Sequence, residues 1–135
     1  MRTVSMLMVL LLAGCATAAP AVTRFDGRYV GTETPDTSDP VCTGAPRPIV
    51  FDVVGDTIRL RTHARYQLDG NVHADGSIEM ADGTGENEIT GAIRDGRLSA
   101  NASSRPPHGR RVHADDASRP ACLSTIDAVL QPPDR

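Results

Sequence analysis

The sequence contains no tryptophan and no lysine, and it has few aromatic residues of any kind. Two Phe and two Tyr are the only aromatic side chains among 135 residues. Because ligand pockets are commonly lined by aromatic side chains, this shortage favours a small, tightly packed core of aliphatic residues over a roomy cavity. The absence of lysine leaves arginine as the only strongly basic residue, which we attribute to a GC-rich genome.

The chain also lacks an excess of positive charge. Its formal net charge is −3 at pH 7, and the acidic residues are spread along it. A protein that binds nucleic acid needs a basic patch or stripe that neutralises phosphates. We therefore expect no nucleic acid among its partners.

The N-terminal apolar run is too short to cross a bilayer as a helix. It extends over Val4–Leu12 and is interrupted only by Ser5. At about 1.5 Å per helical residue, it falls well short of the ~30 Å hydrocarbon core. Because Arg2 gives the segment a positive start, the arrangement is typical of an export signal.

The residues that follow, Leu12-Ala13-Gly14-Cys15, resemble the lipobox of bacterial lipoproteins. In that motif an aliphatic residue and two small residues precede an invariant cysteine. The resemblance implies cleavage between Gly14 and Cys15, a diacylglycerol on the Cys15 thiol, and usually an acyl chain on the new amine. Several acyl chains together give lasting attachment to a membrane. The resemblance covers residues 1–15 and carries no information about the rest of the chain.

The position after the lipobox cysteine bears on the destination of the protein. Ala16 stands where an Asp would suggest retention in the inner membrane, so the outer membrane, facing the periplasm, is the expected location. The alternative is a protein secreted to the periplasm after cleavage at an A-x-A site, for which Ala16-Thr17-Ala18 would serve.

Four segments are expected from these signals. They are a signal peptide over 1–14, the lipidated cysteine with a short tether over 15–24, a β domain over 25–131 and a frayed tail over 132–135. One domain agrees with the length of the chain.

Two cysteines remain once the lipobox cysteine is set aside. Cys42 and Cys122 form the only possible pair in an exported chain, where disulfides persist. Metal binding by these thiols is the competing idea, but no C-x-x-C spacing and no nearby His supports it. We predict a disulfide.

Short runs of alternating apolar and polar residues, separated by glycine-containing turns, fill the chain from Phe25 onward. The first run, over 25–33, is expected to be the opening strand, with Phe25 and Tyr29 on one face. The clearest hairpin joins 49–54 to 58–62 through the two-residue turn Gly55-Asp56. Asp-Gly recurs at 69–70, 75–76, 82–83 and 95–96. Asp and Gly tolerate the positive φ angles of tight turns, so each of these pairs is expected to reverse the chain.

The pattern predicts an all-β domain, a small antiparallel meander of seven or eight strands. An up-and-down barrel or a curled sheet would bury one face of each strand and hide the strand edges. A two-sheet sandwich explains the same pattern. The final run, Cys122 to Leu130, is expected to lie beside the first strand.

No motif for catalysis or metal binding is present. The segment with His113, Asp115 and Asp116 contains metal-ligating side chains, but it lacks the spacing of a known site and is expected to be a solvated loop. There is no G-x-S-x-G elbow and no phosphate-binding glycine loop. We predict no catalytic residue, no metal and no cofactor.

Three basic residues, Arg59, Arg61 and His63, alternate along one expected strand and would share its outer face. The simplest interpretation is a solvated sheet surface. The functional interpretation is a contact for an anionic partner.

These features together predict a membrane-anchored envelope lipoprotein with a small, non-enzymatic β domain that binds or supports an envelope protein or glycan. The alternative is a tethered inhibitor of a lysozyme or protease, by analogy with other small disulfide-bonded barrels on lipid anchors. No oligomeric state is predicted.

Overall fold

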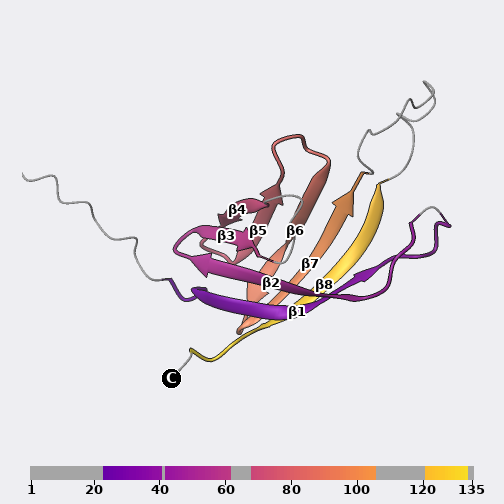
Figure 1. Ribbon diagram of the computed structural model, residues 1–135. Coiled ribbons are helices and arrows are strands. Elements are labelled where there is room, and N and C mark those ends of the chain that lie inside the picture. Colours follow the sequence, from indigo (N-terminus) through magenta and orange to yellow (C-terminus); the bar gives the residue numbers. More distant parts are fainter. Residues whose placement is uncertain (1–22, 41, 62–67, 106–120, 134–135) are drawn as a thin grey trace, which may run out of the picture.

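A computed structural model describes residues 23–40, 42–61, 68–105 and 121–133. These ranges contain eight strands (Figure 1). The strands are β1 (Gly27–Pro35), β2 (Arg47–Val54), β3 (Thr57–Leu60), β4 (Asp69–Val72), β5 (Ser77–Ala81), β6 (Asn87–Arg94), β7 (Arg97–Ser104) and β8 (Cys122–Leu130). Within the described ranges, no helix has the length and apolar character needed to span a bilayer. The expected signal peptide, the lipobox and most of the tether lie outside them.

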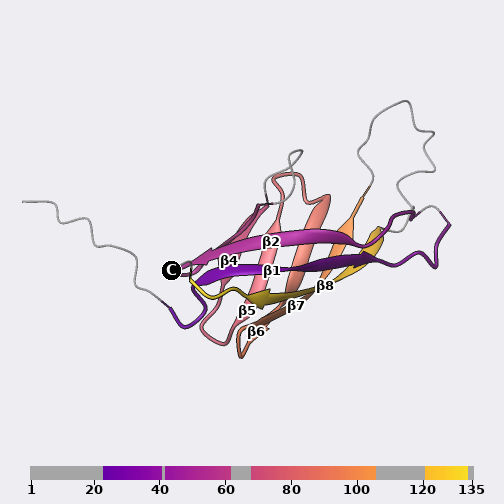
Figure 2. The same ribbon diagram turned by 60° about the horizontal axis from the view of Figure 1, so that its bottom comes forward.

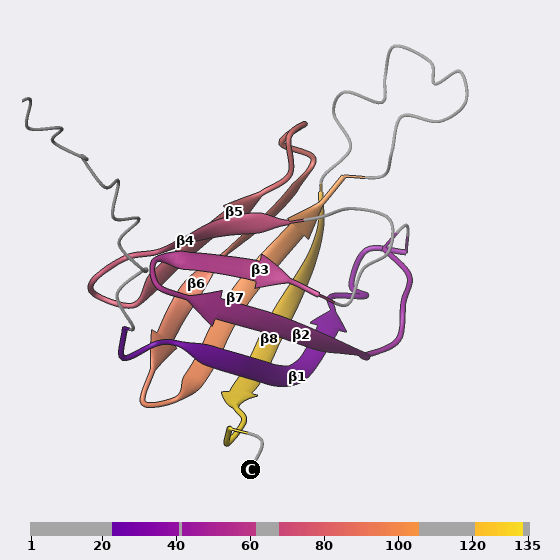
Figure 3. The ribbon, with the colours of Figure 1, turned by 60° about the vertical axis from the view of Figure 1, so that its left-hand side comes forward.

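The eight strands form one closed barrel. Each strand pairs with its sequence neighbours, β8 pairs with β1, and every pairing is antiparallel. The prediction of an all-β meander closed as an up-and-down barrel is therefore confirmed, and the sandwich alternative is not found. Closure gives every one of the eight strands two partners, so none of them presents a free edge. In Figure 3, β1 to β4 lie on the near side of the barrel and β6 to β8 cross behind them.

Two of the predicted tight turns are two-residue turns with a glycine at positive φ. The two-residue turn Gly55-Asp56 joins β2 to β3, with φ of 64° at Gly55. At the β6–β7 turn φ is 50° at Asp95 and 73° at Gly96. Positive φ at both central residues, as at Asp95 and Gly96, is the signature of a type I′ turn, whereas positive φ at the first central residue alone, as at Gly55, is typical of a type II′ turn. Both turn types match the twist of the strands they join. The sequence therefore specifies these hairpins through residue type.

One predicted turn is wrong. Asp69-Gly70 lies inside β4, where it pairs with both β3 and β5. A side chain at position 70 would collide with the backbone of Glu79 on β5. The glycine thus allows two strands to approach closely and does not reverse the chain.

The first strand starts later than the sequence predicts. Residues before Gly27 form a turn, in which the amide of Asp26 donates to the carbonyl of Thr23 at 3.2 Å. Phe25 is buried in the core with Tyr29, but it reaches the core from this turn and not from β1.

Apolar side chains from β2 to β8 fill the barrel interior, together with three of the four aromatic residues, of which β1 supplies Tyr29. The buried cluster comprises Phe25, Tyr29, Ile49, Phe51, Val53, Ile58, Leu60, Leu68, Val72, Ile78, Met80, Ile89, Ile93, Leu98, Ala100, Ile126 and Ala128. The Tyr29 hydroxyl donates to the carbonyl of Phe25 at 2.9 Å. Burial raises the pKa of Tyr29, and the Asp26 carboxylate adds to this effect, so the hydroxyl keeps its proton and acts as a donor.

Glycines on the inner face let the small barrel close. Gly31 of β1 shares its face with Tyr29, and a side chain there would collide with the β8 backbone. Gly91 of β6 stands in the same relation to the β7 backbone at Ser99 and Ala100. Small inward positions allow strands to bend and coil tightly.

Candidate binding site at the open end of the barrel

The two ends of the barrel differ in the lengths of their connections. At one end the turns are short, over 55–56, 73–76 and 95–96. The connections at the other end cover 36–46, 61–68, 82–86 and 105–121. We call these the short-turn end and the open end. Figure 2 shows the end of β8 beside the start of β1 at the short-turn end, and the β1–β2 connection at the opposite end.

The chain enters the barrel at the short-turn end. The Thr23 hydroxyl donates to the carbonyl of Gly55 at 3.1 Å, and the Gly55 amide donates to the Asp26 carboxylate at 2.9 Å. Arg24 donates to the carbonyl of Ala74 at 3.0 Å. These contacts fix residues 23–26 against the β2–β3 and β4–β5 turns.

A hollow of about 440 Å³ lies at the open end. Its lining residues are Glu33, Pro35, Cys42, Thr43, Gly44, Ala45, Arg47, Ser104, Cys122, Leu123 and Ser124. They come from the ends of β1, β2, β7 and β8 and from the β1–β2 connection. The hollow therefore lies at the open end of four strands that are consecutive in the closed barrel.

An ion pair within hydrogen-bonding distance occupies this hollow. Arg47 Nε donates to Glu33 Oε2 at 2.8 Å, and Ser124 Oγ donates to Glu33 Oε1 at 2.6 Å. The Glu33 side chain is 8% exposed, whereas that of Arg47 is 46% exposed. The carboxylate thus lies in a largely desolvated position, while half of its cationic partner remains in water.

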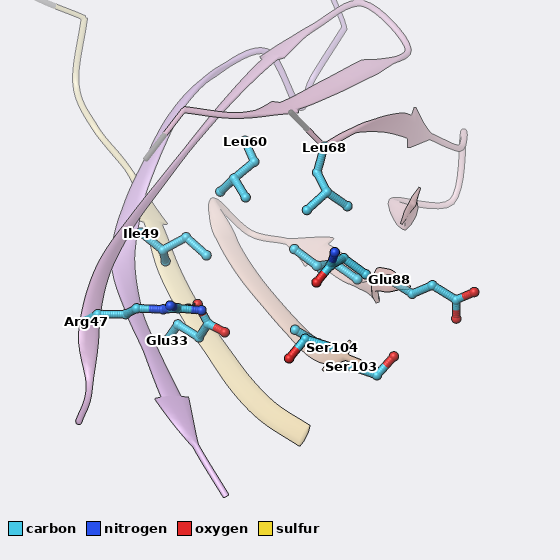
Figure 4. Close-up of a pocket in the computed structure, with 11 residues that line it drawn as sticks. Glu33, Arg47, Ile49, Leu60, Leu68, Glu88, Ser103 and Ser104 are labelled. Carbon is cyan, nitrogen blue, oxygen red and sulfur yellow. Dashed lines mark hydrogen bonds and ion pairs between the residues drawn. The ribbon is translucent and has the colours of Figure 1, made fainter. Parts of the chain in front are cut away.

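Figure 4 shows the inner part of this site. Glu33 and Arg47 lie side by side and point toward the centre, and Ser104 faces them from β7. Ser103 and Glu88 point away from the centre. Together with Ser124 of β8, the groups that converge on the site therefore come from β1, β2, β7 and β8.

The barrel has little space beneath the polar rim. The inner pocket that contacts Ile49, Leu60, Leu68 and Ile89 has a volume of about 20 Å³. A space of this size holds roughly one water molecule. The described interior is filled by its own side chains, so a ligand has room only in a surface hollow. Besides the hollow at the open end, one of about 380 Å³ lies at the short-turn end, lined by Arg24, Phe25, Asp75, Ile93, Arg94, Asp95 and Gly96.

The predicted disulfide is present, and it lies at this end. Cys42 and Cys122 are bonded, with their Cα atoms 5.4 Å apart. The bond fixes the β1–β2 connection to the start of β8, and both cysteines line the hollow. It therefore holds one wall of the hollow against the barrel.

The two described arginines of the predicted basic row have acidic neighbours. Arg59 pairs with Asp69 at 2.8 Å, and Arg61 pairs with Asp52 at 3.3 Å. All four side chains lie on the outer surface, as predicted for the two arginines. His63 lies outside the described residues. Asp52 also lies 3.0 Å from Arg28, so three arginines share two carboxylates on this surface, and each of the two predicted arginines already has an ion-pair partner.

Apart from the two cysteines, sequence reasoning did not single out the residues of the hollow. Strand alternation could have found them, because Glu33 shares a face with Tyr29, and Ser124 shares a face with Ile126. Arg47 likewise shares a face with Ile49. A charged residue in phase with core residues was the available signal.

Among the described residues, no group of His, Cys, Asp and Glu side chains is arranged to hold a metal ion. The segment with His113, Asp115 and Asp116 lies outside those residues. Comparisons with protein-family models, with curated proteins and with solved structures find no match.

Proposed function

We propose that the protein is an exported lipoprotein whose barrel is a non-catalytic binding module. The lipobox, with Cys15 as the lipidated residue, supports the anchor. The bonded pair Cys42 and Cys122 fits an oxidising compartment outside the cytoplasm. The hollow at the open end supports binding, because it joins fixed polar groups to an apolar wall.

One observation carries the proposal: the chain enters the barrel at the end opposite the hollow. Residues 23–26 are fixed to the short-turn end. Fully extended, the segment 16–22 spans about 25 Å. An anchor at Cys15 would therefore keep the short-turn end near the membrane and direct the open end away from it.

In this arrangement the partner is an envelope protein or glycan that approaches the open end. The outer membrane, facing the periplasm, is the proposed location, and secretion to the periplasm is the alternative. A carrier of lipids or other large apolar ligands is disfavoured, because the interior is packed with side chains.

Tethered inhibition of a lysozyme or protease is the second candidate, favoured by the apolar rim of the hollow. Leu123 lines the hollow and is 55% exposed. Protein interfaces commonly bury a few such anchor side chains at their centre. An inhibitor would use Leu123 to contact the enzyme.

Two variants test the anchor. Cys15→Ser should release the protein from membranes and leave a chain without acyl mass by mass spectrometry. Ala18→Arg disrupts only the A-x-A site, so the mass that acylation adds to the chain should be the same as in the wild type. The anchor would be overturned if Cys15→Ser left the membrane fractionation unchanged and Ala18→Arg abolished processing of the signal peptide. These two results would favour secretion.

Capture from an envelope extract tests the binding end. Leu123→Asp changes an exposed apolar residue at the open end, and Val54→Asp changes one that is 60% exposed at the short-turn end. We expect the first variant to lose the captured partner and the second to retain it. A captured hydrolase that the protein inhibits supports the second candidate. Equal capture by both variants contradicts binding through the open end.

A further inference from the structure

We infer that the short-turn end of the barrel rests on the bilayer surface, with the side chains of Val54 and Leu130 inserted at the level of the lipid headgroups. The inference deepens the proposed function by giving the barrel its own contact with the membrane, and it rests on the lipid anchor at Cys15. The binding proposed for the open end does not depend on it.

Exposed apolar side chains gather at the short-turn end. Among the described residues, four large apolar side chains are exposed, and three of them lie at this end. Val54 is the last residue of β2, and Val129 and Leu130 are the last two residues of β8. Only Leu123 lies at the open end. Single exposed apolar residues are normal on a soluble protein, whereas their grouping at one end indicates a contact surface.

Val54 lies beside the point at which the chain enters the barrel. The Thr23 hydroxyl donates to the carbonyl of Gly55, the residue that follows Val54, at 3.1 Å. Val54 is 60% exposed, the largest fraction among the large apolar side chains of the described residues. The segment that joins Thr23 to Cys15 spans about 25 Å when fully extended. An acylated Cys15 would therefore bring this turn close to the lipid.

Leu130 belongs to the same end, on the other side of β1. Its amide donates to the carbonyl of Gly96 in the β6–β7 turn at 2.8 Å. Its side chain covers Gly27, where a side chain would collide with Leu130 Cδ1. Gly27 pairs with Val53, the neighbour of Val54. Val54 and Leu130 thus lie on the two strands that pair with the start of β1, and Figure 2 shows this start beside the end of β8.

The charges at this end indicate the kind of lipid surface. The hollow there is lined by two arginines, Arg24 and Arg94, and by two aspartates, Asp75 and Asp95. Because the two signs balance, the hollow gives an anionic surface little reason to bind. Zwitterionic headgroups carry a phosphate, which arginine can contact, and an ammonium group, which aspartate can contact. A zwitterionic phospholipid surface therefore fits this end best.

The lipid anchor makes a weak contact sufficient. Even one myristoyl chain gives only marginal membrane binding, so two aliphatic side chains would not hold a free protein on a bilayer. Linking two binding elements through a short segment makes the second contact intramolecular, with an effective concentration on the order of millimolar. Beside an anchor, the contact at Val54 and Leu130 therefore serves to orient the barrel and to direct the open end away from the membrane.

Single tryptophan probes test the inference, because the sequence contains no tryptophan of its own. The acylated protein with Val54→Trp is reconstituted into phosphatidylcholine vesicles, with and without lipid brominated near the headgroup end of its acyl chains. Its emission should shift to shorter wavelength and be quenched by the brominated lipid. Leu123→Trp, which replaces a side chain 55% exposed at the open end, should show neither change. Equal quenching of the two probes, or no quenching of Val54→Trp, overturns the inference.

A second substitution tests the native side chains, since tryptophan itself favours a membrane interface. In the Val54→Trp protein, Leu130→Asp should reduce the quenching, whereas Leu123→Asp should leave it unchanged. Unchanged quenching with Leu130→Asp would show that the introduced tryptophan reaches the lipid by itself, and this contradicts the inference. If Leu130→Asp fails to fold, the comparison of Val54→Trp with Leu123→Trp still decides.

Lipid composition separates this contact from its alternatives. Replacing part of the phosphatidylcholine by anionic phosphatidylglycerol should not increase the quenching of Val54→Trp. An increase would assign the contact to the arginines and overturn the role of the apolar side chains. A shift to shorter wavelength without quenching by brominated lipid would indicate that protein, such as a second copy of the chain, covers Val54, and would also overturn the inference.

Flotation with vesicles and mass spectrometry distinguish failure of this inference from failure of the anchor. If the protein carries acyl chains and floats, but Val54→Trp is not quenched, the anchor stands and the contact is overturned. If the protein carries no acyl chain and does not float, both are overturned. Capture through Leu123 at the open end is measured independently of these results.

Discussion

Ser124 donates a hydrogen bond of 2.6 Å to Glu33 across the junction between the last strand and the first. This junction is the one strand pairing that is not made by sequence neighbours. Because both residues are buried, the bond also defines the hollow at the open end. Closure of the barrel and construction of the site thus depend on the same pair.

Ser124→Ala should destabilise the barrel. The substitution removes a buried donor to a carboxylate, and hydrogen bonds to charged groups contribute about 2 kcal/mol. Urea unfolding at pH 7 would measure the change. Ser99→Ala provides the control, because Ser99 lies on the exposed face of β7, and its effect should stay within about 0.5 kcal/mol. Equal effects of the two substitutions would show that the Ser124 bond adds nothing to stability.

Removal of the disulfide should lower the free energy of unfolding by more than Ser124→Ala does. Cys42 and Cys122 are separated by 80 residues, and in the chain-entropy model a loop of this size stabilises the fold by about 4.5 kcal/mol. Wild-type protein should therefore unfold at lower urea concentration after reduction. The double variant Cys42→Ala/Cys122→Ala should match the reduced wild type and show no response to reductant. A loss below about 1 kcal/mol would indicate that the unfolded chain is already constrained near this bond.

The fold could be predicted where residue type and alternation agree. At Gly55-Asp56 the turn residues stand between two runs of alternating apolar and polar residues, and the hairpin is present as predicted. The last strand, Cys122–Leu130, has the predicted bounds and lies beside β1 as predicted. Local signals are sufficient in these places because the turn or the alternation has only one consistent arrangement.

The errors arise where a residue type has two physical uses. Gly70 follows an Asp, as turn glycines do, but it serves close packing between β4 and its neighbours. Only the register of three strands distinguishes these uses. Glu33 was not recognised because charge normally indicates a solvent-facing position, and its partners Arg47 and Ser124 lie far from it in the sequence. These residues come together because the barrel closes, and a pattern of neighbouring residues in the sequence does not indicate that closure.

Gly31→Ala should disrupt the barrel although alanine is a small residue. A methyl group at Gly31 would overlap the β8 backbone at Asp127 and Ala128, and backbone cannot move aside as a flexible side chain can. Overpacking of this kind costs about 1–3 kcal/mol. Thermal unfolding would detect it as a lower midpoint.

Gly83→Ala is the matched control for this substitution. A methyl group at Gly83 would have no neighbour within 4 Å. The substitution should leave the midpoint almost unchanged or raise it slightly, because alanine restricts the unfolded chain. If the Gly31 variant were as stable as the Gly83 variant, the two strands would have to separate more easily than the barrel geometry implies.

The Asp82 carboxylate should make stability depend on pH in the acid range. Hydrogen bonds hold the pKa of Asp82 far below its ordinary value of 3.8, first that from the Asn87 side chain and then those from Thr84 and Glu86. As pH falls through the ordinary value, the unfolded chain takes up a proton before the folded one does. The stabilisation is therefore complete well above pH 3.8 and is lost as pH falls from that value toward the lowered pKa.

Asp82→Asn should accordingly be less stable than the wild type at pH 7, and the difference should shrink between pH 4 and pH 2. Urea midpoints measured across this range would show the convergence. Asn87→Ala removes the main donor and should flatten the same part of the profile, whereas Asn101→Ala, on the exposed face of β7, should leave it unchanged. A deficit in Asp82→Asn that persists unchanged to pH 2 would mean that Asp82 acts through the shape of the β5–β6 connection and not through its charge.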